Sequence, residues 1–91
     1  MKNLLAIDFD GVIRIDDEPA DYVFEALNHL RAGGYQIIIL TARDTKEVKK
    51  WLQSYGFPEF YVTNTKPDGA CAYIDDRAVR FTNWRDIAKK F

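Results

Sequence analysis

Short apolar runs alternate along the chain with longer stretches in which apolar residues recur every three or four positions. Residues 4–9 and 36–40 are apolar and partly β-branched, which is typical of strands buried on both faces. Residues 60–63 and 72–75 form shorter runs of the same kind, and residues 79–81 are a candidate edge strand. Strands that alternate with helices predict a three-layer α/β domain, with a short parallel sheet of about four to five strands flanked by helices.

The intervening stretches carry the end signals of helices. Pro19 is expected to open the first helix, and the pair Gly33 and Gly34 to end it. Asp44 and Glu47 have the spacing of a capping box at the start of a second helix. Asn83 is placed to cap a final helix that runs almost to the end of the sequence.

Two connections differ from an ordinary strand–helix crossover. Residues 12–18 alternate loosely between apolar and polar, which predicts a loop or a small hairpin. The stretch between Lys66 and Ala72 spans at most about 18 Å when extended, whereas a parallel crossover normally uses a dozen or more residues. One face of the sheet should therefore be thinly covered, and we expect either the C-terminal helix or a second subunit of a homo-oligomer to close it.

Composition narrows the class of protein. Ninety-one residues, 47% of them hydrophobic, correspond to one folded domain over residues 1–91. The single cysteine fits a reducing compartment, and the apolar runs are too short to cross a bilayer, so we expect a cytoplasmic protein without a membrane partner. The net charge of −1 provides no long-range attraction to nucleic acid, which disfavours that partner without excluding it.

Polar residues follow the predicted strands and form the candidate site. Asp8 and Asp10 end the first strand, Thr41 follows the second, and Asp75 and Asp76 end the fourth. In parallel sheets, ligands bind outside the C-terminal ends of the strands, so these side chains should share one rim. Crowded carboxylates repel one another, and a divalent cation such as Mg²⁺, which prefers hard oxygen ligands, removes that penalty. The predicted metal site consists of Asp8, Asp10, Asp75 and Asp76.

The same rim has the groups that phosphoryl transfer needs: a nucleophile, positive groups around the phosphate, and an acid–base group for the leaving oxygen. Asp8 can attack phosphorus, and Asp10 can transfer the proton. Thr41 and Lys66, which follows the third strand by a few residues, can hold the phosphate. Gly11 suits a point where the backbone approaches a phosphate closely.

Residues directly after Thr41 complete the candidate phosphate- and substrate-binding set. Arg43 lies two positions after Thr41 and is the candidate contact to the substrate, with Ala42 between them. Arg14 is a further basic residue near the predicted rim.

Four short motifs occur in the order of those of the haloacid dehalogenase superfamily. They are Asp8-Phe9-Asp10-Gly11-Val12, Thr41 after an apolar strand, Lys66-Pro67, and Asp75-Asp76. The resemblance spans residues 5–76 and implies a Rossmann-like sheet, a phospho-aspartyl intermediate on Asp8, and Asp10 as general acid and then base. It also implies Mg²⁺ bound by Asp8, the Asp10 carbonyl and Asp75, with Asp76 either a further ligand or a support through water.

An aspartate at the position of Asp10 marks the phosphatases and phosphotransferases of the superfamily rather than its dehalogenases. The chain has no room for a cap domain between Val12 and Pro19 or between Val62 and Lys66, so the resemblance is to a small capless member with an open site. We therefore expect a Mg²⁺-dependent phosphatase that hydrolyses a phosphate monoester of undetermined class.

Other interpretations compete with this one. Asp75 and Asp76 could pair at the surface with Arg77 and Arg80. A receiver domain fits poorly, because its phospho-acceptor aspartate ends a mid-chain strand, where this sequence has Thr41. The alternative function is a regulatory module of the same fold, which binds Mg²⁺ and a phosphorylated ligand with weak or no turnover. The Asp8/Asp10 pair argues against this alternative, because binding alone needs no general acid.

Overall fold

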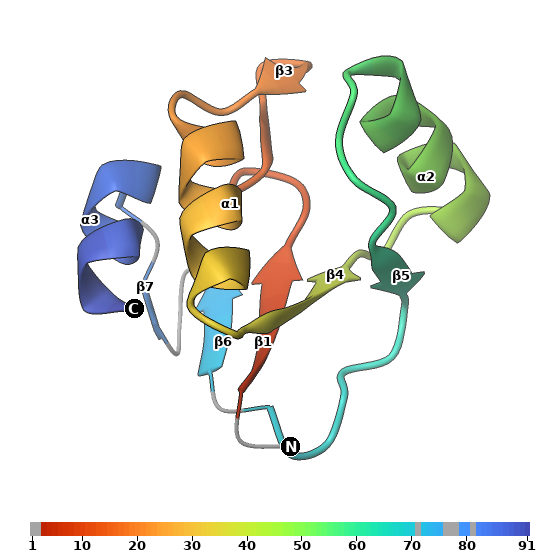
Figure 1. Cartoon of the computed structure of the whole chain (residues 1–91). Helices are drawn as coiled ribbons and strands as arrows, with labels where there is room; N and C mark the ends of the chain where they lie inside the picture. Colours follow the sequence, from red (N-terminus) through yellow and green to blue (C-terminus); the bar gives the residue numbers. More distant parts are fainter. Residues whose placement is uncertain (1–2, 71, 76–78, 81) are drawn as a thin grey trace.

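The computed structural model describes residues 3–70, 72–75, 79–80 and 82–91, with the backbone alone for residues 75, 79 and 80 (Figure 1). Five strands form the main sheet: β1 (Leu4–Asp8), β4 (Gln36–Leu40), β5 (Tyr61–Thr63), β6 (Ala72–Asp75) and β7 (Val79–Arg80). Two short strands form a hairpin: β2 (Arg14–Ile15) and β3 (Glu18–Pro19). The helices are α1 (Val23–Ala32), α2 (Thr45–Ser54) and α3 (Trp84–Lys90).

All neighbouring strands of the main sheet are parallel, in the order β5-β4-β1-β6-β7. The predicted α/β class with a short parallel sheet is therefore confirmed. The chain moves from β1 to β4 and β5 on one side and then returns to place β6 on the other side of β1. This change of direction lies beside β1, and such a switch point is where parallel sheets bind ligands.

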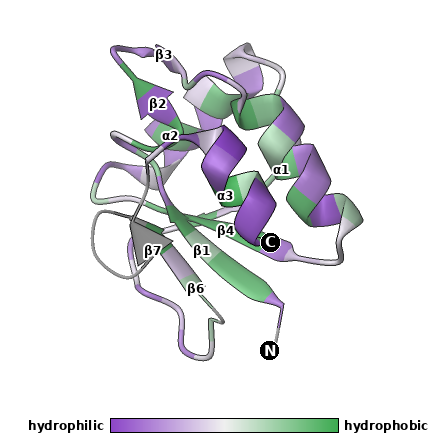
Figure 2. Cartoon of the chain, turned by 90° about the vertical axis from the view of Figure 1, so that its left-hand side faces the viewer, coloured by the Kyte–Doolittle hydropathy of each residue, from purple (hydrophilic) through white to green (hydrophobic). Residues whose placement is uncertain are grey.

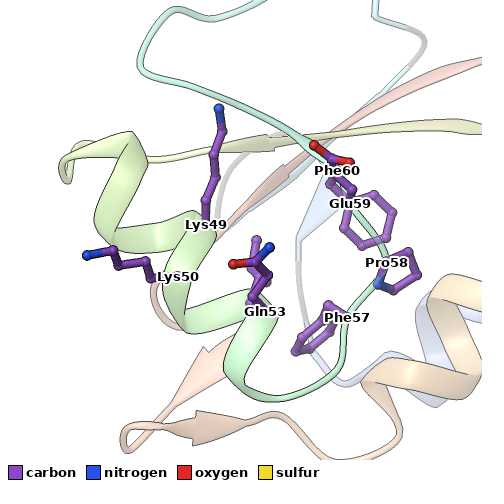
Figure 3. A pocket seen from close by; sticks show the side chains of 8 residues that line it. Lys49, Lys50, Gln53, Phe57, Pro58, Glu59 and Phe60 are labelled. Carbon is purple, nitrogen blue, oxygen red and sulfur yellow. The ribbon is translucent and has the colours of Figure 1, made fainter.

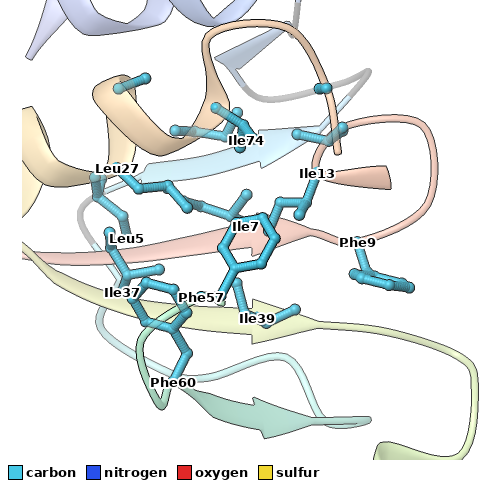
Figure 4. Packing of buried hydrophobic residues seen from close by; sticks show 14 of the residues in the cluster. Leu5, Ile7, Phe9, Ile13, Leu27, Ile37, Ile39, Phe57, Phe60 and Ile74 are labelled. Carbon is cyan, nitrogen blue, oxygen red and sulfur yellow. The ribbon is translucent and has the colours of Figure 1, made fainter. Parts of the chain in front are cut away.

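The three helices lie on one side of the sheet, which we call the helix face (Figure 2). Successive right-handed crossovers in the same direction place α1 and α2 on the same side. Helix α3 packs against α1, and its Trp84 and Ile87 belong to the same buried cluster. Alternate residues of the strands enter this cluster, as Figure 4 shows for Leu5, Ile7 and Ile39.

The opposite side, which we call the loop face, has the other strand residues, including the buried Leu4, Ala6 and Ile38. Its third layer is the segment 64–70, held where the Tyr73 hydroxyl donates to the Pro67 carbonyl. A helix-free connection was expected here. The expectation that the C-terminal helix would close this face is wrong, because α3 packs on α1 at the helix face.

The first helix starts later than predicted. Pro19 pairs with Arg14 in the hairpin, and the Ala20 amide donates to the Ile13 carbonyl over 2.8 Å, so α1 begins only at Val23. The hairpin itself was one of the two forms expected for residues 12–18. Asp16 and Asp17 at its tip have φ values of 52° and 64°, the backbone of a two-residue turn that matches the twist of a hairpin.

Asp44 and Asn83 are confirmed as the caps of the later helices, whereas the Glu47 side chain, predicted to complete a capping box with Asp44, forms an ion pair with Arg43. Asp44 accepts a hydrogen bond from the Lys46 amide at 2.9 Å, and Asn83 accepts one from the Asp86 amide at 2.9 Å. Each cap satisfies a backbone donor that the first turn of a helix leaves without a partner. Gly33 follows α1, as expected.

None of the described helices has the length and apolar character needed to cross a membrane.

Candidate functional site

The structure brings three predicted site positions to one edge of the sheet. Asp8 is the last residue of β1 and pairs in register with Leu40, so Thr41 follows directly beside it. Ile7 pairs with Ile74 on the other neighbour, so the next position there, Asp75, lies alongside Asp8. Because the side chains of a strand alternate, the half-buried Asp8 side chain is on the loop face, with that of Ala6.

Thr41 is held firmly at this edge. Its side chain is buried, and its hydroxyl oxygen accepts a hydrogen bond from the Arg43 amide at 3.0 Å. The Asn64 side-chain amide donates to the carbonyls of Thr41 and Arg43, each over 2.8 Å. Sequence reasoning missed Asn64, whose only signal was an amide residue directly after a strand, a position from which it can bond local backbone. The bend at 41–43 is thereby fixed before any ligand binds.

Asp10 lies at the outer part of the rim, with a 47% exposed side chain. One of its oxygens accepts a hydrogen bond from Arg14 at 3.0 Å, and the other accepts one from Arg43 at 2.7 Å. The turn after β1 brings Arg14 back to this point, because the Phe9 carbonyl accepts from the Arg14 amide and the Gly11 amide donates to the Arg14 carbonyl. The sequence placed both arginines near the rim but did not pair either of them with Asp10.

The charges around Arg43 act on its ionisation. The hydrogen bond to Asp10, followed by the attraction of the same carboxylate, raises the pKa of Arg43 above its ordinary value. Glu47, 3.6 Å away, adds to this attraction. Because the pKa is raised, the Arg43–Asp10 pair stabilises the folded protein at every pH below the ordinary arginine pKa. This stabilisation is lost only as the pH rises through the still higher pKa of Arg43 in the folded protein. Arg43 is therefore a cation across the physiological range.

Gly11 is in the left-handed region, with φ of 79°. A Cβ atom built on it would meet no other atom within 4 Å, so the demand for glycine here comes from backbone conformation and not from crowding. The space above Gly11 is open, which leaves room for a ligand to approach its backbone. Ala42, the other small residue of the predicted substrate-binding set, is exposed at the bend after β4.

Lys66 lies on the loop face. Its ammonium nitrogen is 4.4 Å from the centroid of the Tyr73 ring, a cation–π contact. Tyr73 pairs in register with Ala6, two residues before Asp8, so this contact lies behind the strand ends and on the same side of the sheet as Asp8. Lys66 would need to extend toward the rim to reach a phosphate there.

Only part of the predicted metal site lies within the described residues, because Asp76 and the side chain of Asp75 are outside them. Among the side chains that are described, no three His, Cys, Asp or Glu form a group that could hold a metal ion. The donor chemistry fits Mg²⁺: Asp8 and Asp75 are neighbouring positions at the ends of adjacent strands, and carboxylate oxygens are its preferred protein ligands. Arg77 and the side chain of Arg80, which the competing interpretation pairs with these aspartates, also lie outside the described residues.

A separate surface pocket of about 310 Å³ lies away from this edge (Figure 3). It is formed by the second half of α2 and by residues 57–60, which precede β5 and so lie toward the opposite end of the parallel sheet. Lys49 and Lys50 border it, together with the mostly buried Phe57 and Phe60. None of the predicted site residues lines this pocket.

Comparisons with known proteins support the fold. No family model matches the chain, and no curated protein matches it. Among solved structures, the chain is similar to a conserved protein coded by a locus from Bacteroides thetaiotaomicron, with 26% sequence identity and a TM-score of 0.77. The match covers 94% of this chain and 86% of that one, so the similarity extends over nearly the whole fold.

Proposed function

We propose that this protein is a Mg²⁺-dependent phosphatase that hydrolyses a phosphate monoester through a phospho-aspartyl intermediate on Asp8. The observation that carries the proposal is the strand register, which puts Asp8, Thr41 and Asp75 at one edge beside the switch point of the sheet. The order of the four sequence motifs, which resembles that of the haloacid dehalogenase superfamily, supports the same chemistry.

The first step forms a bond between an Asp8 carboxylate oxygen and phosphorus and breaks the bond to the leaving oxygen. Asp10, two residues beyond Asp8, gives a proton to that oxygen. In the second step a water oxygen attacks phosphorus, Asp10 takes the proton of that water, and the bond to Asp8 breaks. The Thr41 hydroxyl, whose oxygen already accepts from the Arg43 amide, is free to donate its proton to a phosphate oxygen.

Mg²⁺ would be held by Asp8, the Asp10 carbonyl and Asp75, with Asp76 beside them, and would offset the negative charge that accumulates on the phosphoryl group. Lys66 and the backbone around Gly11 would supply the remaining positive and hydrogen-bonding groups. The substrate class stays open, and an uncapped rim is compatible with a bulky ester. We place the activity in the cytoplasm because the sequence has a single cysteine.

The decisive experiment measures phosphate release from a panel of monoesters, with Mg²⁺ and with a chelator. Native protein should release phosphate only with Mg²⁺, and Asp8→Asn should lower kcat by about 10³-fold or more, because an amide cannot replace the attacking carboxylate. Asp21→Asn, a change of the same kind at an exposed aspartate before α1, should behave as native.

A beryllofluoride adduct on Asp8, located by mass spectrometry, would support the proposal without knowledge of the substrate. Activity that survives Asp8→Asn, or that needs no divalent ion, would contradict it.

A second candidate function is a module that binds Mg²⁺ and a phosphorylated ligand with little or no turnover. The contacts of Asp10 and Lys66 favour it, because both Asp10 oxygens accept hydrogen bonds from arginines and Lys66 lies over the Tyr73 ring. Calorimetry would distinguish the two: Mg²⁺-dependent binding of phosphate esters with no product formed supports the binding module.

A further inference from the structure

Two guanidinium groups from different elements converge on the Asp10 carboxylate. Arg14 belongs to the hairpin strand β2, and Arg43 to the bend before α2. The ion pairs continue outward on both sides, from Arg14 to Asp17 at 3.4 Å and from Arg43 to Glu47 at 3.6 Å. The edge of the sheet is therefore bordered by two positive groups, each bonded to a different oxygen of one carboxylate.

The hairpin that carries Arg14 is well supported. Arg14 is 16% exposed, and its guanidinium lies 5.4 Å from the centroid of the Phe9 ring. The Tyr55 hydroxyl at the end of α2 donates to the Asp17 carbonyl at 3.4 Å. Both the stem and the tip of the hairpin are thus tied to other parts of the molecule, so Arg14 is positioned before a ligand arrives.

The pairing of these arginines with Asp10 is suited to exchange. Asp10 and Arg43 are 47% and 41% exposed, and ion pairs at that exposure contribute little to stability. A guanidinium, in contrast, has a planar set of donors that matches a carboxylate or a phosphoryl group. An incoming anion can therefore replace the Asp10 carboxylate on Arg43 at small cost to the fold, and on the less exposed Arg14 its negative charge takes over the role of Asp10 as counterion.

The place of the arginines relative to the reaction follows from the role of Asp10. In the proposed function, Asp8 and Thr41 hold the transferred phosphoryl group, and Asp10 faces the leaving oxygen. Groups in direct contact with the Asp10 carboxylate consequently flank the leaving group rather than the phosphoryl group. When another anion binds the two arginines, the Asp10 carboxylate is released from them, and its oxygens can then contact the leaving oxygen.

We propose that Arg14 and Arg43 form a second anion subsite, so that the preferred substrate is a phosphate monoester whose leaving group has a carboxylate or second phosphoryl group close to the ester oxygen. This inference rests on the proposed function. The anion of the leaving group takes the place of the Asp10 carboxylate between the two guanidinium groups.

Two matched esters test this subsite: 3-carboxyphenyl phosphate and 3-carbamoylphenyl phosphate. They differ in the charge of one group and little in size. The native protein should have a kcat/KM about 10-fold to 100-fold higher for the carboxylate ester, the range expected for hydrogen bonds to a charged group. The ratio of the two kcat/KM values is the quantity to compare between variants.

Arg14→Gln and Arg43→Gln should each lower this ratio, and the double variant should bring it to about 1, because the charged donors are lost. Lys50→Gln is the matched control: it removes a cation from an exposed position of α2 and should leave the ratio unchanged. A measurement that needs no variant is inhibition of the native protein by the two products, where 3-hydroxybenzoate should bind more tightly than 3-hydroxybenzamide.

Equal kcat/KM values for the two esters, or a preference that survives in the double variant, would overturn the subsite and leave the phosphatase in place. If Mg²⁺-loaded native protein hydrolysed neither of these esters nor any monoester of the panel, the phosphatase would be refuted, and the subsite with it.

Discussion

Gly11 and Asp10 are adjacent in the sequence, yet different forces determine the two positions. Gly11 is required by the left-handed backbone of the turn after β1. Asp10 is placed by that turn but oriented by two arginines, one of which is 33 positions away in the sequence. The first property is local and could be suspected from a glycine after a strand. The second depends on how the hairpin and α2 meet.

Replacing Gly11 with alanine tests the local part. Gly11→Ala should lower the free energy of unfolding by about 1–2 kcal/mol, the usual cost of a side chain in the left-handed region. Gly33→Ala is the control, because Gly33 has φ of −79° and alanine fits that backbone. Urea denaturation measures both, and equal stabilities of the two variants would contradict the assignment of strain to Gly11.

At the scale of elements, end signals predicted the later helices better than the first. The caps Asp44 and Asn83 act through side-chain contacts two or three residues away, so the local sequence is enough to identify them. Pro19 has the same kind of signal but belongs to the hairpin, where Arg14 pairs with it. A non-local strand pairing thus overrode a local preference.

The cap of α2 can be tested on its own. Asp44→Ala should destabilise the protein by about 1 kcal/mol, because the Lys46 amide loses its acceptor. Asp44→Asn retains an oxygen at the same place and should lose much less stability. Thermal unfolding of both variants decides this. Since α2 follows the bend that holds Thr41 and Arg43, the alanine variant should also release less phosphate in the assay that tests the proposed function.

At the scale of the whole molecule, Trp84 joins the end of the chain to its beginning. Its indole N–H, from the first turn of α3, donates to the Val12 carbonyl over 2.8 Å, and its side chain is fully buried. This contact supports the turn that follows Asp8 and Asp10.

Trp84→Phe retains a large apolar ring and removes the donor. It should lower the free energy of unfolding by about 1–3 kcal/mol, the cost of a buried carbonyl left without its partner. Trp51→Phe is the comparison, because Trp51 is half-buried and contacts the Phe9 and Tyr55 rings, contacts that a phenylalanine ring can also make. If Trp84→Phe lowered the free energy of unfolding no more than Trp51→Phe does, the hydrogen bond from Trp84 to the Val12 carbonyl would not contribute to stability.

The sequence by itself determined the order of the strands and helices, the caps of α2 and α3, and the polar residues that end each strand. These properties depend on periodicity and on contacts between residues a few positions apart, so the local sequence is enough to predict them. The absence of a helix from the described residues 67–70 was also predictable, because the length of the chain limits what it can form.

Only the tertiary structure decided which helix covers which face, and which charges meet at the rim. The position of α3 against α1 and the two arginines on Asp10 join segments far apart in the sequence. No local pattern encodes such pairings, because they result from the packing of the whole sheet and its helices. The contact of Lys66 with Tyr73 has the same origin, since the return of segment 64–70 along the loop face brings the two together.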